Sequence, residues 1–334
     1  MPPPSHTDLQ GLAAEIRRYP GVTRKRRLGA LTEHFQAASD ARVVADFGED
    51  CAVLDLPGMK DDFLLLALDA IVPELLHRSP RAAGYSSVLV NVLDVVAMAG
   101  HPIAAVDFLG STGRAFESEV ASGMAEAARH FAVPIVGGHL HPDDPSPSLA
   151  VAILGRVSKR HCTFSHTARE GDTLLVAVDL DGRRLKDYPM AWSPLRTKSR
   201  RAVERRLNAV RGAGAEGLVG ACKDASNPGI VGTLGMMLEA SGVGGFLDVE
   251  KLPKPPGITL RDWVLMFQGC GFVYAARPHK AQRLAHALEG GGLTCAAVGR
   301  AFKARRLDLV QGKEAVRVFD LRRGGVTGIP PVQS

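Results

Sequence analysis

Hydrophobic and polar positions follow two successive series of strand-like and helix-like periods along the chain. In the first half, apolar or alternating runs predict strands at 42–46, 52–56, 63–68, 103–109, 133–136 and 149–157. Helical spacing predicts helices at 81–99 and 117–131, after a helical stretch that breaks at Tyr19-Pro20-Gly21. The second half predicts strands at 173–178, 271–276 and 294–298 and helices at 199–211, 230–240 and 280–288. This order of elements is typical of an α/β or α+β protein.

The length of the chain supports two domains, each with a core of its own. A chain of 334 residues exceeds what one hydrophobic core normally organises. We expect an N-terminal helical arm over 1–40, which leads into an N-terminal domain over 41–160, and a C-terminal domain over 170–320. The boundary should fall in the polar segment 159–171.

Composition places the chain among globular proteins of a reducing compartment. Hydrophobic residues make up 46% and charged residues 23%, which excludes a disordered chain or a coiled coil. The five cysteines form no C-x-x-C pair, and an odd number suits reduced thiols better than a disulfide framework. No apolar run approaches the roughly 18 residues of a membrane span, and the first ten residues lack the apolar core of a signal peptide. We therefore expect a cytoplasmic protein without a membrane partner.

Positive charge is concentrated in one segment, 181–211. This segment contains ten Lys and Arg residues against three acidic ones, whereas the rest of the chain is nearly neutral. Aromatic residues for stacking on bases do not interleave with it, so we do not expect a nucleic-acid partner. A solvated basic helix is one interpretation, and a surface that attracts an anionic small molecule is the other.

The helix at 81–99 is apolar nearly all round, which predicts burial, yet it carries polar residues along one face. Ser87, Asn91 and Asp94 are spaced so that they share that face. A buried carboxylate requires a cation or several hydrogen-bond donors to offset its desolvation. Asp94 should therefore have a compensating partner, unless Asp94 and Asn91 only cap a neighbouring loop.

Other carboxylates stand at the ends of the strands that precede this helix. Glu49 and Asp50 lie in the turn Gly48-Glu49-Asp50, and Asp69 closes the strand at 63–68. Carboxylates that converge from a turn, a strand end and a helix are the oxygen ligands that Mg²⁺ prefers, together with water and substrate phosphates. The sequence therefore predicts a magnesium site in the N-terminal domain.

A second polar motif, Lys223-Asp224-Ala225-Ser226-Asn227-Pro228-Gly229, introduces the helix at 230–240. Pro228 suits the first helical position, and Gly242 suits the C-terminal stop. The free N–H groups of the helix N-terminus can hold a phosphate, and its glycines permit either a ligand or another backbone to come close. Neither a P-loop nor a strand-borne G-x-G-x-x-G is present, which disfavours the common nucleotide-binding folds.

A third motif, Gly137-Gly138-His139-Leu140-His141, follows the strand at 133–136. Taken alone, His139 and His141 could begin the metal site of a hydrolase. That interpretation requires further His or Asp ligands at later strand ends, and His279 and His286 lie in or beside a predicted helix.

The three motifs, in this order, resemble the aminoimidazole ribonucleotide synthetase (AIR synthase)-related superfamily. That superfamily also contains thiamine-monophosphate kinase, selenophosphate synthetase and formylglycinamidine ribonucleotide synthetase. The residues that carry the resemblance are Gly48-Glu49-Asp50-Cys51-Ala52-Val53-Leu54, Asp69 with Glu74 and His77, the segment from Asn91 to Pro102, Gly137-Gly138-His139, the segment from Lys223 to Gly244, and Gly269-Cys270-Gly271-Phe272. They extend from about 48 to 300, most of the chain.

The resemblance implies a two-domain fold that binds ATP and Mg²⁺ and forms a homodimer. Its N-terminal strands would close a barrel-like interface with a second copy. This copy would also cover the strand at 63–68, which is apolar on both faces, unless that strand is simply central within a single subunit. The implied metal ligands are Asp50, Asp69, Asn91, Asp94 and Asp224. The implied nucleotide-binding residues are Gly48, Glu49, Asn91, Gly137 and Gly138. The implied catalytic residues are Asp224, His139 and Lys223.

Two positions depart from the pattern of the thiamine-monophosphate kinases. His139 and Asn227 stand where the kinases have aspartates. Selenophosphate synthetase would require a reactive cysteine near the start of the chain, but here no cysteine precedes Cys51. The chain therefore best resembles a synthetase-related branch, for which we expect an ATP- and Mg²⁺-dependent phosphotransferase or synthetase that acts on a small polar metabolite. The alternatives are a nucleotide-binding subunit that serves a partner enzyme without catalysis, and a metal-dependent hydrolase built on His139 and His141.

Overall fold

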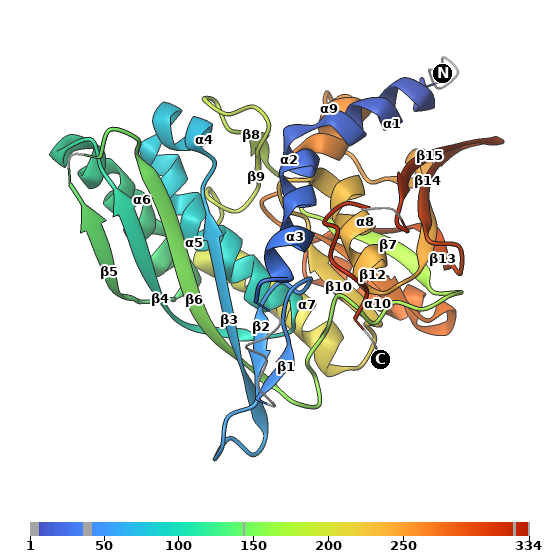
Figure 1. Cartoon of the computed structure of the whole chain (residues 1–334), viewed down its shortest axis with the longest axis horizontal. Helices are drawn as coiled ribbons and strands as arrows, with labels where there is room; N and C mark the ends of the chain where they lie inside the picture. Colours follow the sequence, from blue (N-terminus) through green and yellow to red (C-terminus); the bar gives the residue numbers. More distant parts are fainter. Residues whose placement is uncertain (1–6, 36–41, 143, 323–324, 333–334) are drawn as a thin grey trace.

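The computed structural model describes residues 7–35, 42–142, 144–322 and 325–332, which form two mixed α/β units with an N-terminal arm (Figure 1). A six-stranded sheet belongs to the first unit, and a seven-stranded sheet belongs to the second. The prediction of a two-domain mixed α/β fold is therefore confirmed.

The sheet of the N-terminal unit has the strand order β1-β2-β3-β6-β4-β5. Its strands are β1 (Val43–Ala45), β2 (Ala52–Leu54), β3 (Asp62–Ala70), β4 (His101–Gly110), β5 (Ile135–His141) and β6 (Ser148–Ser158). Only the β4–β5 pair is parallel. The helices α4 (Pro73–Arg78), α5 (Pro80–Ala97) and α6 (Arg114–Phe131) lie on one face of this sheet (Figure 1).

The opposite face of the six-stranded sheet is apolar and lies open. Side chains alternate between faces along a strand, so Leu65 and Ala67 of β3 are buried under the helices, while Leu66 and Leu68 are 46% and 67% exposed. Val106 of β4 is exposed as well. Within the described residues, this single chain forms an open sheet with edges at β1 and β5 rather than a closed barrel.

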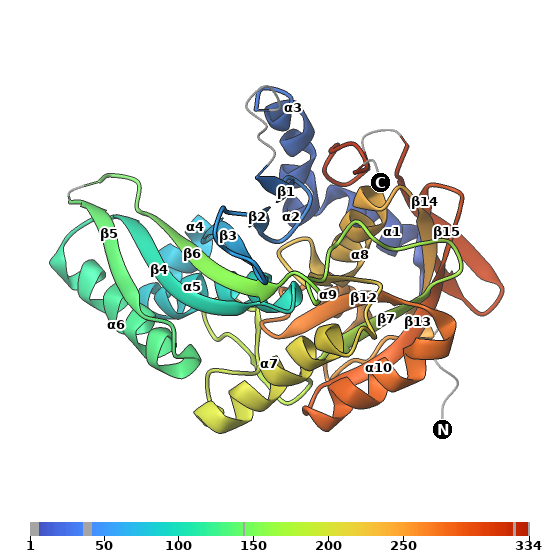
Figure 2. The same cartoon turned by 90° about the horizontal axis from the view of Figure 1, so that it is seen from below.

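The sheet of the C-terminal unit has the strand order β10-β12-β7-β13-β11-β14-β15, with one parallel pair, β11–β14. Its strands are β7 (Thr173–Val178), β10 (Ala221–Asp224), β11 (Gly244–Asp248), β12 (Gly271–Ala276), β13 (Thr294–Phe302), β14 (Arg306–Gln311) and β15 (Glu314–Asp320). The helices α7 (Arg200–Ala215) and α10 (Pro278–Gly290) lie on one side of it, and α8 (Gly229–Ala240) lies on the other (Figure 2). The short helix α9 (Leu260–Leu265) contacts α8, and a small hairpin pairs β8 (Arg183–Arg184) with β9 (Trp192–Ser193).

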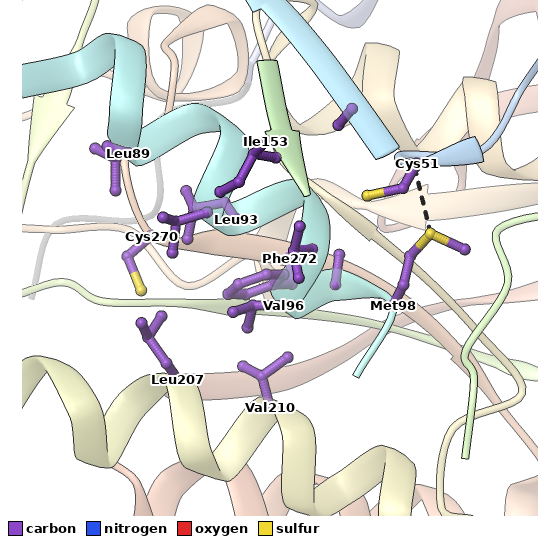
Figure 3. Close-up of a cluster of buried hydrophobic side chains, with 14 of the residues drawn as sticks. Cys51, Leu89, Leu93, Val96, Met98, Ile153, Leu207, Val210, Cys270 and Phe272 are labelled. Atoms are coloured by element: carbon purple, nitrogen blue, oxygen red, sulfur yellow. Dashed lines mark hydrogen bonds between the residues drawn. The ribbon is translucent and has the colours of Figure 1, made fainter. Parts of the chain in front are cut away.

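The helix α5 is buried because it packs against both units. Figure 3 shows Leu93 and Val96 of α5 close to Phe272 of β12, with Leu207 and Val210 of α7 below and Ile153 of β6 above. These residues belong to one continuous hydrophobic cluster. A helix between two layers has no solvent face, which explains the apolar pattern at 81–99.

The N-terminal arm packs mainly on the C-terminal unit, although the domain that follows it in the chain is the first one. It consists of α1 (Leu9–Arg18), α2 (Pro20–Thr23), the 3₁₀ helix η1 (Arg24–Arg27) and α3 (Leu28–Thr32). Leu9, Leu12 and Ile16 are buried in the core of the C-terminal unit, and the N–H of Gly29 donates to the carbonyl of Thr327 at 3.0 Å. The proposed extent of the arm, 1–40, stays a prediction, and its residues 1–6 and 36–40 lie outside the described residues.

The cysteines lie within the cores of the two units or beside them. The five cysteines are free, and burial raises the pKa of the Cys51 and Cys222 thiols well above its usual value. No helix among the described residues has the length and apolarity required to cross a membrane. The cytoplasmic location stays a prediction.

Candidate functional site

Three buried carboxylates meet where the two units adjoin. They are Asp50 in the turn between β1 and β2, Asp94 on α5 and Asp224 at the end of β10. One oxygen from each lies within 4.8 Å of the others. The convergence of Asp50 and Asp94 follows the sequence prediction, and Asp224 reaches them from the second unit.

Local backbone geometry explains how each carboxylate arrives there. Gly48 has a φ of +107°, a conformation that favours glycine, and this allows the turn to present Asp50 to the neighbouring unit. Asp94 is carried by the helix that packs between the two sheets. Asp224 stands at the register position opposite Phe272, where β10 ends and the loop toward α8 begins.

Burial and mutual repulsion destabilise the charged forms of these carboxylates. The pKa of Asp94 is raised well above its usual value by burial and then by the charges of Asp224, Asp69 and Asp50. The pKa of Asp224 is raised well above its usual value by burial and by Asp50. In Asp50 burial also raises the pKa, against the opposing effect of Lys223.

One ammonium group partly compensates this negative charge. Lys223 is buried, and its Nζ donates to Asp50 Oδ1 and, at 3.2 Å, to the carbonyl of Gly48. Burial lowers the pKa of Lys223, but the attraction of Asp50 outweighs it, so the net pKa is raised. A single positive charge beside three clustered carboxylates leaves a negative excess, which a divalent cation would offset.

The amide of Asn91 adds an acceptor that lacks a partner among the described residues. Its Nδ2 donates to the carbonyl of Ser87 at 2.8 Å, whereas its Oδ1 is buried and accepts no hydrogen bond. A buried acceptor without a donor is unusual in a folded protein and fits a role toward a cation or its water. The donor set as a whole, carboxylates with an amide oxygen, fits Mg²⁺.

A cavity of about 470 Å³ opens beside these carboxylates. It is lined by the arm, including Lys25, by the turn at 48–50, by β3 up to Asp69, and by the C-terminal segment, including Thr327. Burial raises the pKa of Asp69, opposed by the charges of Lys25 and Lys223. Asp69 is not one of the three carboxylates that come within 4.8 Å of one another, although it lines the same cavity.

The side chain of Glu49 is already engaged by the protein. Its Oε1 lies 2.6 Å from Nδ1 of His166, and its Oε2 accepts from the N–H of Ser165 at 2.7 Å. The segment between the two units is thereby tied to the turn that carries Asp50. Glu49 lines the cavity, but its carboxylate already has these partners.

The motif Gly137-Gly138-His139 lies apart from the carboxylates within one chain. It belongs to β5, an edge strand of the sheet, and the strands β3, β6 and β4 separate it from β2. Gly138 has a packing reason, because a Cβ there would lie 2.7 Å from the backbone oxygen of Asp107. The predicted roles of Gly137, Gly138 and His139 at the cavity therefore have no support in the geometry of a single chain.

The two histidines of β5 do not assemble a metal centre within the described residues. The ring centroids of His139 and His141 lie 4.8 Å apart, and the ring of His139 stacks on that of Phe108 with a centroid distance of 6.1 Å. In the described part of the chain, the group of three potential metal ligands is that of Asp50, Asp94 and Asp224. No third ligand lies beside His139 and His141 among these residues. The hydrolase alternative, which requires further ligands beside these histidines, stays a prediction.

Lys25 was missed by the sequence interpretation. It belongs to a run of four basic residues, Arg24 to Arg27, which resembles an ordinary solvated surface. The only available signal was its place in an amphipathic arm, and that arm could not be assigned to the cavity without the fold.

Comparisons with known proteins agree with this architecture. Residues 48–157 match the family described as AIR synthase related protein, N-terminal domain, and residues 172–311 match AIR synthase related protein, C-terminal domain. The chain belongs to the AIR synthase-related family. The resemblance drawn from the motifs is confirmed.

Relatives in this family differ in how much of their length the chain covers. An uncharacterized protein of Methanocaldococcus jannaschii is 34% identical over 325 residues, 96% of this chain and 99% of that protein. Thiamine-monophosphate kinase of Rhodopirellula baltica is 29% identical over 228 residues, 64% of this chain and 66% of the kinase. Among solved structures, Thermotoga maritima PurL complexed with ATP is similar over 98% of this chain, with a TM-score of 0.73 and 17% identity. The chain spans about half of that protein, 53% of its length, and the likeness shows the fold alone.

Proposed function

We propose that the protein binds ATP with Mg²⁺ beside Asp50, Asp94 and Asp224 and transfers its terminal phosphoryl group to a small metabolite. The observation that carries this proposal is the incompletely compensated carboxylate cluster at the edge of a cavity of about 470 Å³. Support comes from family members named as kinases and from a similar fold solved with ATP.

Each residue of the cluster has a distinct part in this proposal. Asp50, Asp94 and Asp224 would hold Mg²⁺, with Asn91 and Asp69 beside them. When bound, the ion neutralises charge on the transferred phosphoryl group. Lys223 donates to Asp50 and so holds this side chain in place in the metal-free protein, and Lys25 of the arm lines the cavity with a positive charge suited to phosphate oxygens.

The transfer itself exchanges one bond to the terminal phosphorus for another. An oxygen of the acceptor forms a bond to that phosphorus, and the bond to the bridging oxygen of ADP breaks. Asp69 lines the same cavity and stands apart from the cluster, so it is the residue suited to take the proton of the acceptor. The protein otherwise contributes positioning and electrostatic stabilisation.

We also propose that two copies associate through the open face of the six-stranded sheet. Leu66, Leu68 and Val106 expose a set of apolar side chains there, and such patches are typical of interaction sites. The family resemblance favours a second copy of this chain as the occupant. This dimer would cover the open face that carries His139.

A nucleotide-binding subunit without catalysis is the second candidate. It is favoured by His139 and Asn227, which replace two aspartates of the kinase pattern. Release of ADP across a panel of small polar metabolites separates the two functions. We expect at least one acceptor to raise ADP release above the rate with ATP alone, and a panel without any such acceptor, in a protein that binds Mg-ATP, favours the subunit.

A further inference from the structure

A second cavity lies between the units, and Asp69 lines both this cavity and the first one. It is lined by Asp69, by Tyr85 and Ser86 of α5, by Tyr188 and Trp192 of the β8–β9 hairpin, and by Asn227. Its volume is about 40 Å³, enough for roughly three water molecules. Asp69 therefore belongs to the lining of both cavities, one on the side of the carboxylate cluster and one on the side of the hairpin.

This narrow chamber continues outward into a wider cavity of about 500 Å³. Leu185, Tyr188 and Arg196 line both of them. Around the wider cavity stand four cationic side chains, Arg183, Arg184, Lys186 and Arg196, against the carboxylates of Glu126 and Asp187. The outer cavity is thus positively charged.

Two of the four cations already have carboxylate partners. Arg196 Nε lies 2.8 Å from Glu126 Oε1, and Arg184 lies 2.5 Å from Asp262. Arg183 and Lys186 are exposed, and no carboxylate pairs with either among the described residues. These two side chains are available to an anion from solution.

The hairpin that carries these cations is fixed by buried hydrogen bonds. Trp192 Nε1 donates to the carbonyl of Asp179 at 2.9 Å, and the N–H of Trp192 donates to the carbonyl of Phe267 at 2.8 Å. The basic segment at 181–211 therefore has two parts. Its first part lines a built cavity, while its second part forms helix α7.

We propose that the narrow chamber and the outer cavity together form the acceptor site, and that the acceptor is a small anionic metabolite with a slender, uncharged reacting end. This inference rests on the function proposed above. The phosphate or carboxylate group of the acceptor would stay near Arg183 and Lys186, outside the chamber. Only a group of a few atoms, such as a hydroxymethyl or carboxamide, fits between the aromatic walls and reaches Asp69.

The chemistry of the chamber explains why the slender end of the acceptor would enter it and the anionic group would stay outside. Its walls are mainly apolar and aromatic, so a charged group inside it would be poorly solvated. Its charged lining residues are Asp69, which repels anions, and Arg196, whose charge is taken up by Glu126. The oxygen of the slender end is directed to Asp69, which lines both cavities, and the anion remains in solvent-accessible surroundings.

Binding of 2-hydroxyethyl phosphate to the metal-free protein tests the proposal. This probe carries a phosphate at one end and a slender hydroxyl at the other, and ethylene glycol is its uncharged counterpart. Without metal, the carboxylate cluster repels phosphate, so calorimetric titration reports on the basic cavity. We expect the wild type to bind the probe and not ethylene glycol. A wild type that binds neither compound overturns the proposal.

A double variant and a matched control locate the binding. Arg183→Ala with Lys186→Ala should weaken the affinity for 2-hydroxyethyl phosphate about tenfold, while the affinity for Mg-ATP is retained. The control, Lys303→Ala with Lys313→Ala, removes two exposed cations from turns next to β14 and should change neither affinity. Unchanged binding of the probe in the first double variant overturns the assignment of the outer cavity.

Two further variants separate this inference from the proposed function. Ser193→Trp places a large ring where the two cavities join, so the affinity for 2-hydroxyethyl phosphate should fall while that for inorganic phosphate stays. Equal effects on both probes contradict the use of the chamber. Asp94→Asn should lose Mg-ATP binding and still bind 2-hydroxyethyl phosphate without metal. Loss of probe binding with Mg-ATP binding intact refutes only this inference, whereas the reverse result refutes only the proposed function.

Discussion

Replacement of Asp94 by asparagine tests the electrostatic reasoning at the carboxylate cluster. The substitution keeps the size of the side chain and removes one of three negative charges whose oxygens lie within 4.8 Å. At an effective dielectric constant of about 20, two unit charges at that distance repel by roughly 3 kcal/mol, and Lys223 offsets part of this. We therefore expect Asp94→Asn to stabilise the metal-free protein by about 1–3 kcal/mol, which corresponds to a rise in melting temperature of about 2 °C or more.

The pH dependence of this gain follows from the sign of the pKa shift. The pKa of Asp94 in the folded protein is raised above its unfolded value of about 4, by burial first and by neighbouring carboxylates second. The folded state therefore holds the proton more tightly, and ionisation destabilises it as the pH rises from about 4 through the raised pKa. The stability difference between Asp94→Asn and wild type should be small near pH 4 and grow toward pH 8.

Ligand binding reverses the order of stability. Saturating Mg-ATP, at about 100 times its dissociation constant, should stabilise the wild type by about 2.7 kcal/mol and leave Asp94→Asn unchanged. Thermal unfolding in chelator and in Mg-ATP, at several pH values, measures both effects. Asp61→Asn is the matched control, since Asp61 is exposed in the turn before β3. An Asp94→Asn protein that is less stable than wild type in chelator at pH 8, or that binds Mg-ATP with wild-type affinity, refutes the reasoning.

Three other substitutions test separate parts of the account. Lys223→Met removes the cation that pairs with buried Asp50, so the metal-free protein should lose about 3–5 kcal/mol of stability in thermal unfolding, and an unchanged melting temperature contradicts the pairing. Lys25→Ala should lower the affinity for Mg-ATP about fivefold in calorimetry without a change in melting temperature, and an unaltered affinity removes the arm from the site. Leu68→Asp places a charge on the open sheet face, so sedimentation equilibrium should give a dimer for wild type and a monomer for the variant; a monomeric wild type that binds ATP excludes the proposed interface.

Local sequence patterns predicted that Asp50, Asp69 and Asp94 lie near one another, because each of them stands out from its own surroundings. Asp94 lies in a helix that is otherwise apolar, Asp69 closes an apolar strand, and Asp50 follows a glycine in a tight turn. Such contrasts are visible without the fold, since a charge in an apolar element requires a partner. The short strand that carries Asp224 was not predicted, and its motif was identified by the loop and helix that follow.

The position of a strand in its sheet could not be obtained from local pattern. Gly137, Gly138 and His139 were expected at the cavity, yet among the described residues β5 pairs with β4 alone and forms an edge of the sheet. The same limit applies to the arm, whose amphipathic face carries no information on which unit covers it. Glu49 was expected to bind nucleotide, but its partner His166 lies 117 positions away in the chain.

Strands with weak apolar character were also missed. In β14 the charged residues Arg306 and Asp308 interrupt the apolar ones, in β15 Glu314, Arg317 and Asp320 do so, and the two strands are joined by a tight turn at Gly312. Their buried residues, such as Leu307, Leu309 and Val318, pack against the arm and α8 in the core of the C-terminal unit. These two strands are stabilised by packing against elements that are distant in the chain. Their own apolar runs are too short to predict strands from the sequence.

The most direct test of the central claim is a crystal structure with Mn²⁺ in place of Mg²⁺ and a non-hydrolysable ATP analogue. Anomalous scattering identifies the position of Mn²⁺ independently of any assumed ligand set. The account predicts an anomalous peak among Asp50, Asp94 and Asp224, with the phosphates of the analogue in the cavity lined by Lys25 and Asp69. A peak at His139 and His141, or a nucleotide bound away from the three carboxylates, would contradict it.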